Sequence, residues 1–584
     1  MNLSLSDIQQ ALKQAPNRKL QGYSIAVLRN ITVESITPYL QYYAFKSGFE
    51  ATVSFGNYDN ILQDCHGGLG ADNKPIFTSE TDIILIFFKL EYFSWSLTRD
   101  FLSLSNEQLE SEFERVLDYV ELTLQAIRKQ SSAVVLWHGL EMPIYKSLGI
   151  LEDQLTDSQT STLKRLEVQM KNIFSRFTNV FYVDLSDCIT QIGINSFYDN
   201  RFWYLSAAPY SLDALNIIAK NDVQYINALN GKNKKCLVLD CDNTLWGGII
   251  DEDGIDGLKL SKHGPGGGFY DFQQELVNLH HRGVALALCS KNNEEDVWEV
   301  FDMHPEMLLK REHIAAYEIN WEDKAGNIKK ISESLNLGLD SFVFVDDSPF
   351  ETDMVREILP QVEVILVDPK KSFDYRKVIG STGYFNSLQY SAVDRQRTKM
   401  YQDESGRRKL QKNSGCIDEF LEKLGMEVTV KYADEKSIQR IAQLTQRTNQ
   451  FNLTTKRYSD ADIKKFVDND TCDVLYLSLK DKDGDAGIVG VAILQFSGDT
   501  GKIDTFLLSC RVIGRGVENA FLSCIIEAAR LRKVEIVQGV YLPTSKNQQV
   551  SEFYNRCGFD EKLRLNIIDS NVDAPAYLLS VIFD

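Results

Sequence analysis

Short apolar runs alternate with longer amphipathic stretches over the first 228 residues. The apolar runs have the length of buried strands and lie at 24–28, 51–55, 82–88, 133–137 and 180–183. The stretches between them that show a helical pattern lie at 32–48, 106–129 and 159–176. Strands that alternate with helices predict a parallel sheet with both faces covered. We therefore expect an α/β domain over residues 1–228.

The next part of the chain repeats the pattern, and its strands end in polar residues. Apolar runs at 236–239, 284–288 and 342–345 are separated by helical stretches, which predicts a second α/β domain over residues 229–370. The turn residues at 251–254 lie between two short apolar pieces and predict a flap-like hairpin. The glycine-rich segment 263–268 predicts a flexible loop that borders the strand ends.

Residues 371–415 have the pattern of a helical connector. Its basic stretches at 395–399 and 406–409 allow two interpretations, a solvated helix face or a patch that meets an acidic partner protein. Residues 416–584 form a third α/β unit. Strands are predicted at 426–430, 474–479, 487–494 and 503–509, with a helix at 438–446 and a hairpin turn at 481–484.

Composition narrows the class of protein. The 584 residues are 43% hydrophobic and 25% charged, as in ordinary globular proteins, and the net charge of −19 argues against nucleic-acid or anionic-membrane binding. The N-terminal residues predict an amphipathic helix and not a signal peptide, and the longest apolar run, 83–88, is too short for a membrane span. The ten cysteines form no CxxC pair. Buried, reduced thiols in a cytoplasmic protein are expected.

Two acids directly follow the apolar strand 236–239. Because side chains alternate along a strand, Asp240 and Asp242 point the same way and Cys241 points away. Ligands bind at the carboxyl ends of strands in open α/β sheets. The pair suits a magnesium site, or a nucleophile beside a general acid, although solvated loop acids give the same pattern.

Further polar residues follow the other strands of this domain. Ser290, Lys291 and Asn292 offer the hydroxyl, cation and amide that bind a phosphate, although a helix N-cap has the same composition. Lys324 lies near a predicted helix start. Asp346 and Asp347 end the strand at 342–345.

The order Asp-x-Asp, Ser, Lys, Asp-Asp resembles the four motifs of the haloacid-dehalogenase-like (HAD) phosphotransferases, with a Rossmann-like fold. The resemblance implies that Asp240 attacks phosphorus and that Asp242 is the general acid and base. It implies that Ser290 and Lys324 hold the phosphoryl group. It further implies Mg²⁺ bound by Asp240, the backbone carbonyl of Asp242 and Asp346, with Asp347 in support. The remaining substrate-binding candidates are Thr244, Lys291 and Asn292.

The first domain resembles the SGNH-hydrolase domains, which are flavodoxin-like in layout, but lacks their catalytic residues. Its first strand leads into residues 29–32 without a serine, and the late segment 199–202 contains no histidine. Triad chemistry needs a base beside a hydroxyl. We interpret the domain as a non-catalytic binding or docking module. His138 is either a remnant of a site or a loop histidine without a chemical role, and the missing partners favour the latter.

The third domain resembles the GNAT acyltransferases. Arg511, Gly514, Arg515 and Gly516 follow a strand and open a helix, where backbone amides can approach a diphosphate. A GNAT-like ending follows at 547–559. Cys510 ends the strand beside this loop and is a candidate acyl-carrying nucleophile, although a buried core thiol is an equal alternative.

The order of the three domains resembles the FkbH-like proteins, described as HAD subfamily IIIC phosphatases. The segments that carry this likeness are 239–248, 290–294, 320–324, 345–349, 448–455 and 506–511. The family implies a substrate such as 1,3-bisphosphoglycerate, a small phosphorylated acid. It also implies delivery of glyceryl to the phosphopantetheine thiol of an acyl carrier protein, although coenzyme A shares that pantetheine. Two alternatives stay open: a plain phosphatase whose GNAT-like domain only binds a partner, and a non-catalytic assembly protein.

Overall fold

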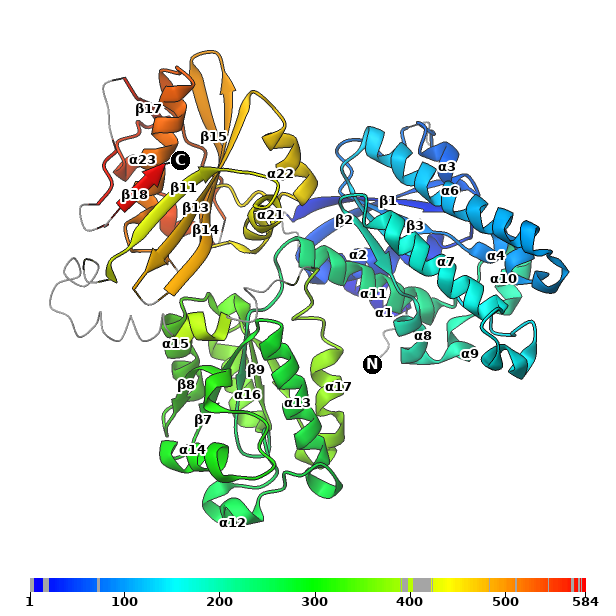
Figure 1. Ribbon diagram of the computed structural model, residues 1–584. Coiled ribbons are helices and arrows are strands. Elements are labelled where there is room, and N and C mark those ends of the chain that lie inside the picture. Colours follow the sequence, from blue (N-terminus) through cyan, green and yellow to red (C-terminus); the bar gives the residue numbers. More distant parts are fainter. Residues whose placement is uncertain are drawn as a thin grey trace. The chain divides into compact units, whose positions relative to one another are not determined.

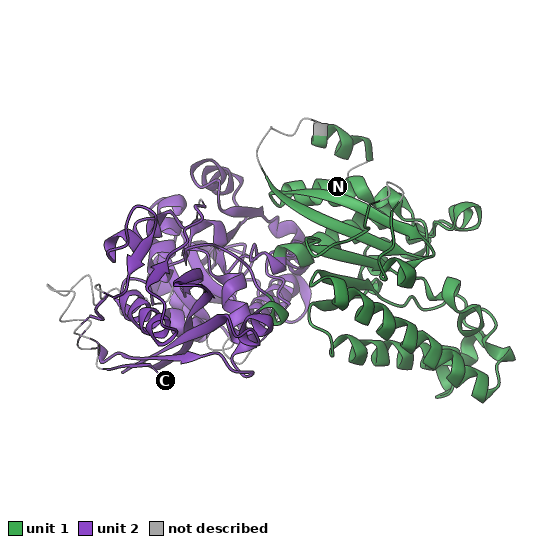
Figure 2. Ribbon diagram, turned by 90° about the horizontal axis from the view of Figure 1, so that it is seen from above, with its two compact units in different colours: residues 1–227, 459–462 green, residues 228–458, 463–584 purple. Residues whose placement is uncertain are grey.

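The computed structural model describes most of the chain, in two compact units. The described residues are 5–13, 20–70, 74–388, 390, 397–402, 422, 424–482, 484–509, 512–544, 546–568, 572–575, 578 and 580–583. One unit comprises residues 1–227 with 459–462, and the other comprises 228–458 and 463–584 (Figure 2). We describe an N-terminal domain (the first unit up to residue 227), a central domain (228–388) and a C-terminal domain (from residue 424).

The N-terminal domain is built on a five-stranded parallel sheet. Its strand order is β2 (Phe49–Tyr58), β1 (Gln21–Arg29), β3 (Ile83–Phe87), β4 (Val134–His138) and β5 (Val180–Val183). Every residue of β3 is buried. This burial explains why the strand is a continuous apolar run, since helices cover both faces of the sheet.

Separate hydrophobic cores lie on the two faces of this sheet. One core includes residues of α1 (Leu5–Lys13), α2 (Thr37–Lys46), α8 (Ser186–Ile192) and α11 (Leu212–Leu229). The other includes residues of α3 (Ile61–Asp64), α6 (Asn106–Gln130) and α7 (Gln159–Phe174). A capping box at Ser105 and Gln108 satisfies backbone amides at the start of α6 and fixes where this long helix begins.

The central domain is again a sheet with helices packed against it (Figure 1). Its strand order differs from that of the N-terminal domain. Its five parallel strands are β10 (Glu363–Leu366), β9 (Phe342–Asp346), β6 (Cys236–Leu239), β7 (Ala285–Ser290) and β8 (Ile314–Ile319). Helices α13 (Gly267–His281) and α14 (Glu294–Met303) contribute to one core, and α15 (Lys324–Leu335) and α16 (Pro349–Ile358) to the other. Strand β6 is central, so its carboxyl end lies between those of two neighbours.

Three sequence predictions for the central domain are wrong in detail. The predicted hairpin at 251–254 is helix α12 (Ile250–Gly257), kinked at Gly254, whose φ of 64° favours glycine. The predicted loop at 263–268 contains a 3₁₀ turn (Gly264–Gly266) that leads directly into α13. The core continues past residue 370, because Tyr375 and Phe385 pack into it around α17 (Tyr375–Gly380).

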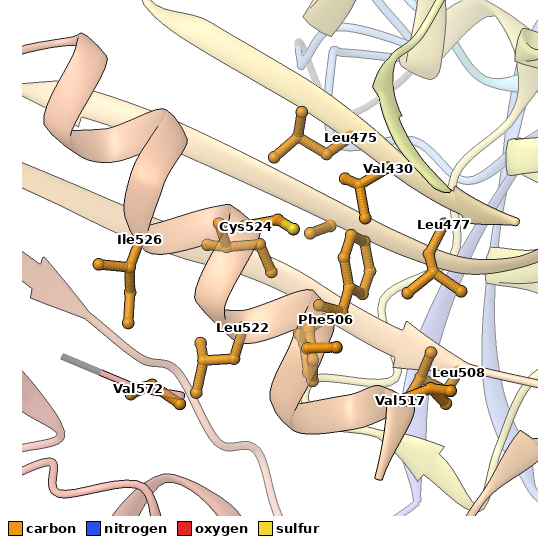
Figure 3. Packing of buried hydrophobic residues seen from close by; sticks show 14 of the residues in the cluster. Val430, Leu475, Leu477, Phe506, Leu508, Val517, Leu522, Cys524, Ile526 and Val572 are labelled. Carbon is orange, nitrogen blue, oxygen red and sulfur yellow. The ribbon is translucent and has the colours of Figure 1, made fainter. Parts of the chain in front are cut away.

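The C-terminal domain has a mixed sheet. Its strand order is β17 (Arg564–Asn566), β16 (Ile536–Gln538), β15 (Thr500–Leu508), β14 (Gly484–Ser497), β13 (Cys472–Asp481), β11 (Glu427–Tyr432) and β18 (Ser580–Phe583). Asp481 pairs with Gly484, so the predicted hairpin is present. Helix α23 (Val517–Leu531) covers one face, where Phe506 and Leu508 of β15 lie among apolar residues of this helix (Figure 3). Helices α21 (Ile438–Arg447) and α22 (Asp460–Val467) contribute to a separate core.

These sheets confirm the predicted fold class of three α/β domains. None of the helices in the described ranges is long and apolar enough to cross a membrane. All eight described cysteines are free, and seven of them are buried. Of the basic stretches of the predicted connector, residues 395–396 and 406–409 lie outside the described residues.

Candidate active site

The polar residues that end β6, β7 and β9 meet at the carboxyl edge of the central sheet, where its parallel strands end. Asp240 directly follows β6, and its backbone amide donates to the Val345 carbonyl at 3.0 Å, which continues the pairing with β9. Asp240 is 6% exposed and Asp346 is fully buried. The predicted acids are therefore fixed by the sheet and withdrawn from bulk water.

Lys324 joins these acids in one network. Its Nζ lies 2.9 Å from Asp240 Oδ1 and 2.5 Å from Asp346 Oδ2. Ser290 Oγ donates to Asp240 Oδ1 at 2.7 Å. Lys324 is the first residue of α15, whose N-cap Asp323 accepts a hydrogen bond from the Gly326 amide. The helix start predicted from sequence thus brings a lysine to the strand ends.

The site has three carboxylates, Asp240, Asp346 and Asp347, and one cation, Lys324. Carboxylate oxygens of Asp240, Asp346 and Asp347 all lie within 4.8 Å of one another. Burial and then the charges of Asp240 and Asp346 raise the pKa of Asp347 to about 6, and burial followed by Asp240 raises the pKa of Asp346. Clustered hard oxygen ligands with excess negative charge suit Mg²⁺. Asp240 and Asp346 would hold it, with Asp347 in support. The backbone carbonyl of Asp242 is the further ligand that the resemblance implies.

Burial opposes the charged form of Lys324, but Asp240 and Asp346 outweigh it and raise its pKa. Lys324 is therefore a permanent cation beside the nucleophile candidate. A buried ammonium at this position can bind the oxygens of a transferring phosphoryl group. It also lowers the repulsion between Asp240 and an approaching phosphate.

Asp242 lies beside the cluster in a different environment. Its carboxylate accepts hydrogen bonds from Trp246 Nε1 at 2.9 Å, from the Ile250 amide at 3.2 Å and from Asn292 Nδ2 at 3.0 Å. Burial raises its pKa against these hydrogen bonds. A carboxyl group with a raised pKa suits proton transfer to and from a leaving oxygen. Its side chain is not among the three clustered carboxylates, so only its backbone carbonyl is a candidate metal ligand.

The turn after Asp242 depends on unusual backbone conformations. Asn243 has a φ of 54° and Gly248 a φ of 108°, and the Gly248 amide donates to Asn243 Oδ1 at 3.1 Å. Tyr375 donates to the Asn243 carbonyl at 2.8 Å. Thr244, a predicted substrate contact, is fully buried, and its hydroxyl makes no hydrogen bond within the described structure. This hydroxyl is left available for a ligand or water.

The other predicted phosphate contacts have different partners in the structure. Asn292 donates to Ser290 Oγ at 3.1 Å as well as to Asp242, so both lie at the site. Lys291 pairs with Glu351 on α16 at 2.7 Å, and its role as a substrate contact stays a prediction. Sequence reasoning assigned no role to Trp246 or Tyr375. Trp246 lies four residues after Asp242, and this short spacing could have predicted their hydrogen bond. Tyr375 is 132 residues from Asn243 in sequence, so no local pattern predicts their contact.

Among the described residues of the N-terminal domain, no triad lies at the equivalent edge of the sheet. Asn30 follows β1, and its side chain accepts from the Lys89 amide at 2.7 Å and donates to the Lys89 carbonyl at 3.0 Å. His138 ends β4, stacks on Phe87 with ring centroids 3.9 Å apart, and lies 3.0 Å from Asp222. It is 1% exposed. The interpretation of His138 as a loop residue is therefore wrong: it is a structural residue of the core.

The glycine turn of the C-terminal domain matches its predicted place. Gly514 and Gly516 have φ values of 79° and 72°, and Gly516 caps α23. The buried guanidinium of Arg515 lies 3.3 Å from Asp481 in the β13–β14 hairpin, and its contact with a diphosphate stays a prediction. Cys510 and Arg511 lie outside the described residues. Backbone amides at the start of α23 thus remain the predicted diphosphate contacts.

The edge of β15 beside this turn is partly occupied. Strand β16 pairs only with Thr500–Lys502 of β15, and β12 (Phe451–Asn452) pairs with Leu507 and Leu508 further along. The buried Asn547 donates to the Asn452 carbonyl at 2.9 Å and holds β12 in place. An extended pantetheine arm would therefore compete with β12 for this edge.

A cavity of about 480 Å³ lies next to Ser509, the residue after β15. Residues of the central and C-terminal domains line it, together with Arg397 from the segment between them. The charged lining residues are the bases Lys235, Arg397, Arg440, Arg447 and Lys546 and the acid Asp340. Lys546 pairs with Asp340, and Lys235 donates to the Arg447 carbonyl at 2.9 Å. The excess of basic groups makes this cavity suitable for an anion.

Comparisons with known proteins agree with the central site. No protein-family model and no curated protein matches the chain. A solved structure, the N-terminal part of the protein BF1531 from Bacteroides fragilis, is 29% identical over 66% of this chain and all of that one, with a TM-score of 0.59. It contains a phosphatase domain complexed with Mg. A structural neighbour with a Mg-bound phosphatase domain thus covers two thirds of the chain.

Other solved structures match only a short part of the chain. A GNAT-family acetyltransferase from Streptococcus pneumoniae is 17% identical over 23% of this chain and 84% of its own, with a TM-score of 0.19. Rv2747 from Mycobacterium tuberculosis, in complex with CoA and NLQ, is 21% identical over 23% of this chain and 71% of its own, with a TM-score of 0.18.

Proposed function

We propose that the protein is a Mg²⁺-dependent phosphatase whose reaction is coupled to acyl transfer onto a carrier thiol. The observation that carries this proposal is the buried network of Asp240, Asp346 and Lys324 with Asp347 beside it. An excess of acid around one lysine has no structural benefit, because the charges repel one another, but it suits a metal-assisted phosphoryl transfer.

The phosphatase step follows from the positions of two acids. The Asp240 carboxylate attacks phosphorus, the bond between phosphorus and the substrate oxygen breaks, and that oxygen takes a proton from Asp242. A water molecule then loses a proton to Asp242 and attacks the aspartyl-phosphate, which releases inorganic phosphate. Bound Mg²⁺ would neutralise phosphate charge. Ser290 and Lys324 orient the phosphoryl group.

The acyl step uses a thiolate. For 1,3-bisphosphoglycerate, a thiolate attacks the carbonyl of the acyl phosphate, the bond from carbonyl carbon to phosphate oxygen breaks, and phosphate leaves. The phosphate ester at the other end is the substrate of Asp240. Glyceryl then passes to the phosphopantetheine thiol of an acyl carrier protein by thioester exchange. Cys510 is the candidate for the first thiol, with Gly514 and Gly516 at the following turn.

Two findings support this coupled reading of the chain. The FkbH-like motif order places the phosphatase residues before a GNAT-like turn, and the basic cavity beside Ser509 suits an anionic group such as a pantetheine phosphate. The similar structure from Bacteroides fragilis supports the phosphatase half. Membership of the FkbH-like family is part of the proposal.

A specific observation favours a second candidate, a plain phosphatase whose C-terminal domain only binds a partner. Strand β12 occupies the edge of β15 where a pantetheine arm would lie, and Arg515 is paired with Asp481. In this case phosphate release would not depend on a carrier thiol.

Intact-mass measurement of the protein and a holo acyl carrier protein separates the two candidates. Both are incubated with Mg²⁺ and freshly generated 1,3-bisphosphoglycerate, and inorganic phosphate is measured in parallel. A glyceryl adduct on the carrier, lost in Cys510→Ser, supports the coupled reaction. Phosphate release without an adduct supports the plain phosphatase.

Two lysine variants provide a matched control for the phosphatase half. Lys324→Gln removes the cation from the site, whereas Lys291→Gln removes one that pairs with Glu351 outside it. We expect Lys324→Gln to lose phosphate release by about 10²-fold or more, and Lys291→Gln to stay within a few-fold of wild type. Equal losses would contradict the assigned site.

A further inference from the structure

A cavity of about 280 Å³ lies at the carboxyl edge of the N-terminal sheet. Its lining comes from the segments after β3 and β4 and from helices α9 (Ile194–Phe197) and α10 (Asn200–Ser206). This edge is where open α/β sheets bind ligands. The volume lies near the lower end of the roughly 300–1,000 Å³ found for small-molecule sites, so the cavity suits a small ligand.

The cavity contains a buried polar network centred on Glu141. Lys89 Nζ donates to Glu141 Oε2 at 2.6 Å, and the two side chains are 10% and 7% exposed. Tyr210 donates to Glu141 Oε1 at 2.5 Å, and Tyr198 donates to Oε2. Burial and then Glu141 raise the pKa of both tyrosines, which keeps their hydroxyls protonated as donors.

This network is held rigidly and retains hydrogen-bonding capacity. Asn30 binds both the amide and the carbonyl of Lys89, which fixes the loop after β3. A carboxylate oxygen accepts about two hydrogen bonds and an ammonium donates three. Lys89 and Glu141 can therefore each bind a ligand hydroxyl without breaking their own pair.

The charges that line the cavity are balanced. Besides Lys89 and Glu141, the lining contains Arg99 and Glu91, and Arg99 Nε donates to Glu91 at 2.6 Å. An ionic ligand would have to break one of these pairs or be buried without a partner, which is costly. The cavity therefore favours an uncharged ligand over a phosphate or a carboxylate, in contrast to the central site.

Aromatic side chains form the walls. Tyr145 is 83% exposed and Tyr204 is 79% exposed, and Trp203 lies beside them on α10. Ile144 is also exposed. Large apolar side chains on the surface around a polar network are uncommon unless a ligand covers them. Flat aromatic faces pack against a ring that has an apolar face of its own.

We propose that this cavity binds a neutral polyhydroxylated ring compound, a monosaccharide or short neutral saccharide. Its hydroxyls would bond to Glu141 and Lys89, and a ring face would pack on Tyr145, with Trp203 lining the cavity as well. No hydrolysis accompanies binding, because Asn30 stands at the end of β1 and His138 is enclosed in the core. The domain is then a recognition module for a sugar.

Ligand-observed saturation-transfer NMR and thermal shift on the full chain test this site. The probes are methyl α-glucoside, N-acetylglucosamine and maltose, with glucose 6-phosphate and glucosamine as charged counterparts. We expect saturable binding of at least one neutral sugar, and weaker binding of the charged counterparts. Absence of saturable binding to all three neutral probes, or tighter binding of a charged one, overturns the proposal.

Two neighbouring variants show whether binding occurs in this cavity. Tyr145→Ala removes a wall residue that is mostly exposed, so folding is preserved, and we expect binding to weaken at least tenfold. Phe202→Ala is the matched control, because Phe202 is a half-exposed aromatic residue of α10 that does not line the cavity. Equal effects of the two substitutions contradict the site. Asp240→Asn should leave sugar binding unchanged, so the result does not depend on the phosphatase proposal.

Discussion

In the central domain, β6, β7 and β9 lead into Asp240, Ser290 and Asp346, whereas in the N-terminal domain β1, β3 and β4 lead into Asn30, Lys89 and Glu141. Both domains use five parallel strands with cores on both faces. In the first, acids outnumber the single buried lysine; in the second, each charge has a partner. We propose that the same architecture provides a site for a cation and a phosphate in one domain, and a site for a neutral ligand in the other.

The largest expected effect is a loss of phosphate release, which we assign to the central sheet edge alone. Asp240→Asn removes the nucleophile, and we expect Mg²⁺-dependent phosphate release to fall by about 10⁴-fold or more. Phosphate release from a panel of phosphate esters measures this. A variant that keeps a tenth of the wild-type rate would exclude Asp240 as the nucleophile.

The second prediction concerns the stability that each domain loses when one partner of its lysine–acid pair is removed. Lys324→Met leaves Asp240 and Asp346 without their cation, and Glu141→Gln leaves Lys89 without its anion. Each should cost about 3–5 kcal/mol of unfolding free energy. Added Mg²⁺ should restore part of the melting temperature of Lys324→Met, because the ion replaces a cation. In Glu141→Gln, whose central site is intact, Mg²⁺ should raise the melting temperature no more than it does in wild type. A response of Glu141→Gln as large as that of Lys324→Met would contradict the difference between the sites.

The third prediction concerns a serine placed at the carboxyl edge of the N-terminal sheet. Asn30→Ser puts a hydroxyl after β1, where SGNH hydrolases have their nucleophile. We expect p-nitrophenyl acetate hydrolysis to stay at the background rate, since His138 is enclosed and bonded to Asp222. Measurable saturable esterase activity in this variant would show that a base can reach the edge after all.

The smallest expected effect is a loss of stability of the central domain at low pH. Burial, then His313 and His281, lower the pKa of His280 in the central domain to about 4, below the value of about 6.5 expected when unfolded. Between these values the unfolded state binds more protons, so this contribution to stability is present above pH 6.5 and is lost as pH falls toward 4.

Thermal unfolding between pH 7.5 and pH 4.5 tests this contribution. The wild type should lose more stability over this range than His280→Gln, which has no imidazole to protonate. His304→Gln is the matched control. The pKa of this less buried histidine is also lowered, chiefly by burial, so its replacement should reduce the loss of stability by less than His280→Gln does. A steeper decline in His280→Gln than in wild type would have the wrong sign.

Much of the central site was predictable because its chemistry is local. Strand alternation places Asp240 and Asp242 on one side and Cys241, which is fully buried, on the other. The positions of Ser290, Asn292 and Asp346 follow from parallel strands that end at the same edge. The ion pairs of Lys291 with Glu351 and of Arg515 with Asp481 could not be predicted, because a flexible basic side chain takes whichever acid the tertiary structure offers.

Local turn chemistry gave a less reliable prediction. The acidic turn residues at 251–254 suggested a hairpin, yet they form helix α12, since Gly254 with its φ of 64° allows a kink instead of a reversal. The aromatic contacts of Trp246 and Tyr375 with the motif after β6 also depend on packing, and Tyr375 is more than a hundred residues away in sequence.

The sequence by itself determined the strands, their carboxyl ends and therefore the acids, serine and lysine of the central site, because these depend on short-range periodicity and on the common direction of parallel strands. Only the tertiary structure decided that β12 pairs with the edge of β15, that His138 is a core residue, and that Lys89, Glu141, Tyr198 and Tyr210 share one hydrogen-bond network. Those contacts join residues that lie tens of positions apart. Their pairing is set by packing and by the need to satisfy buried charges, which no local pattern records.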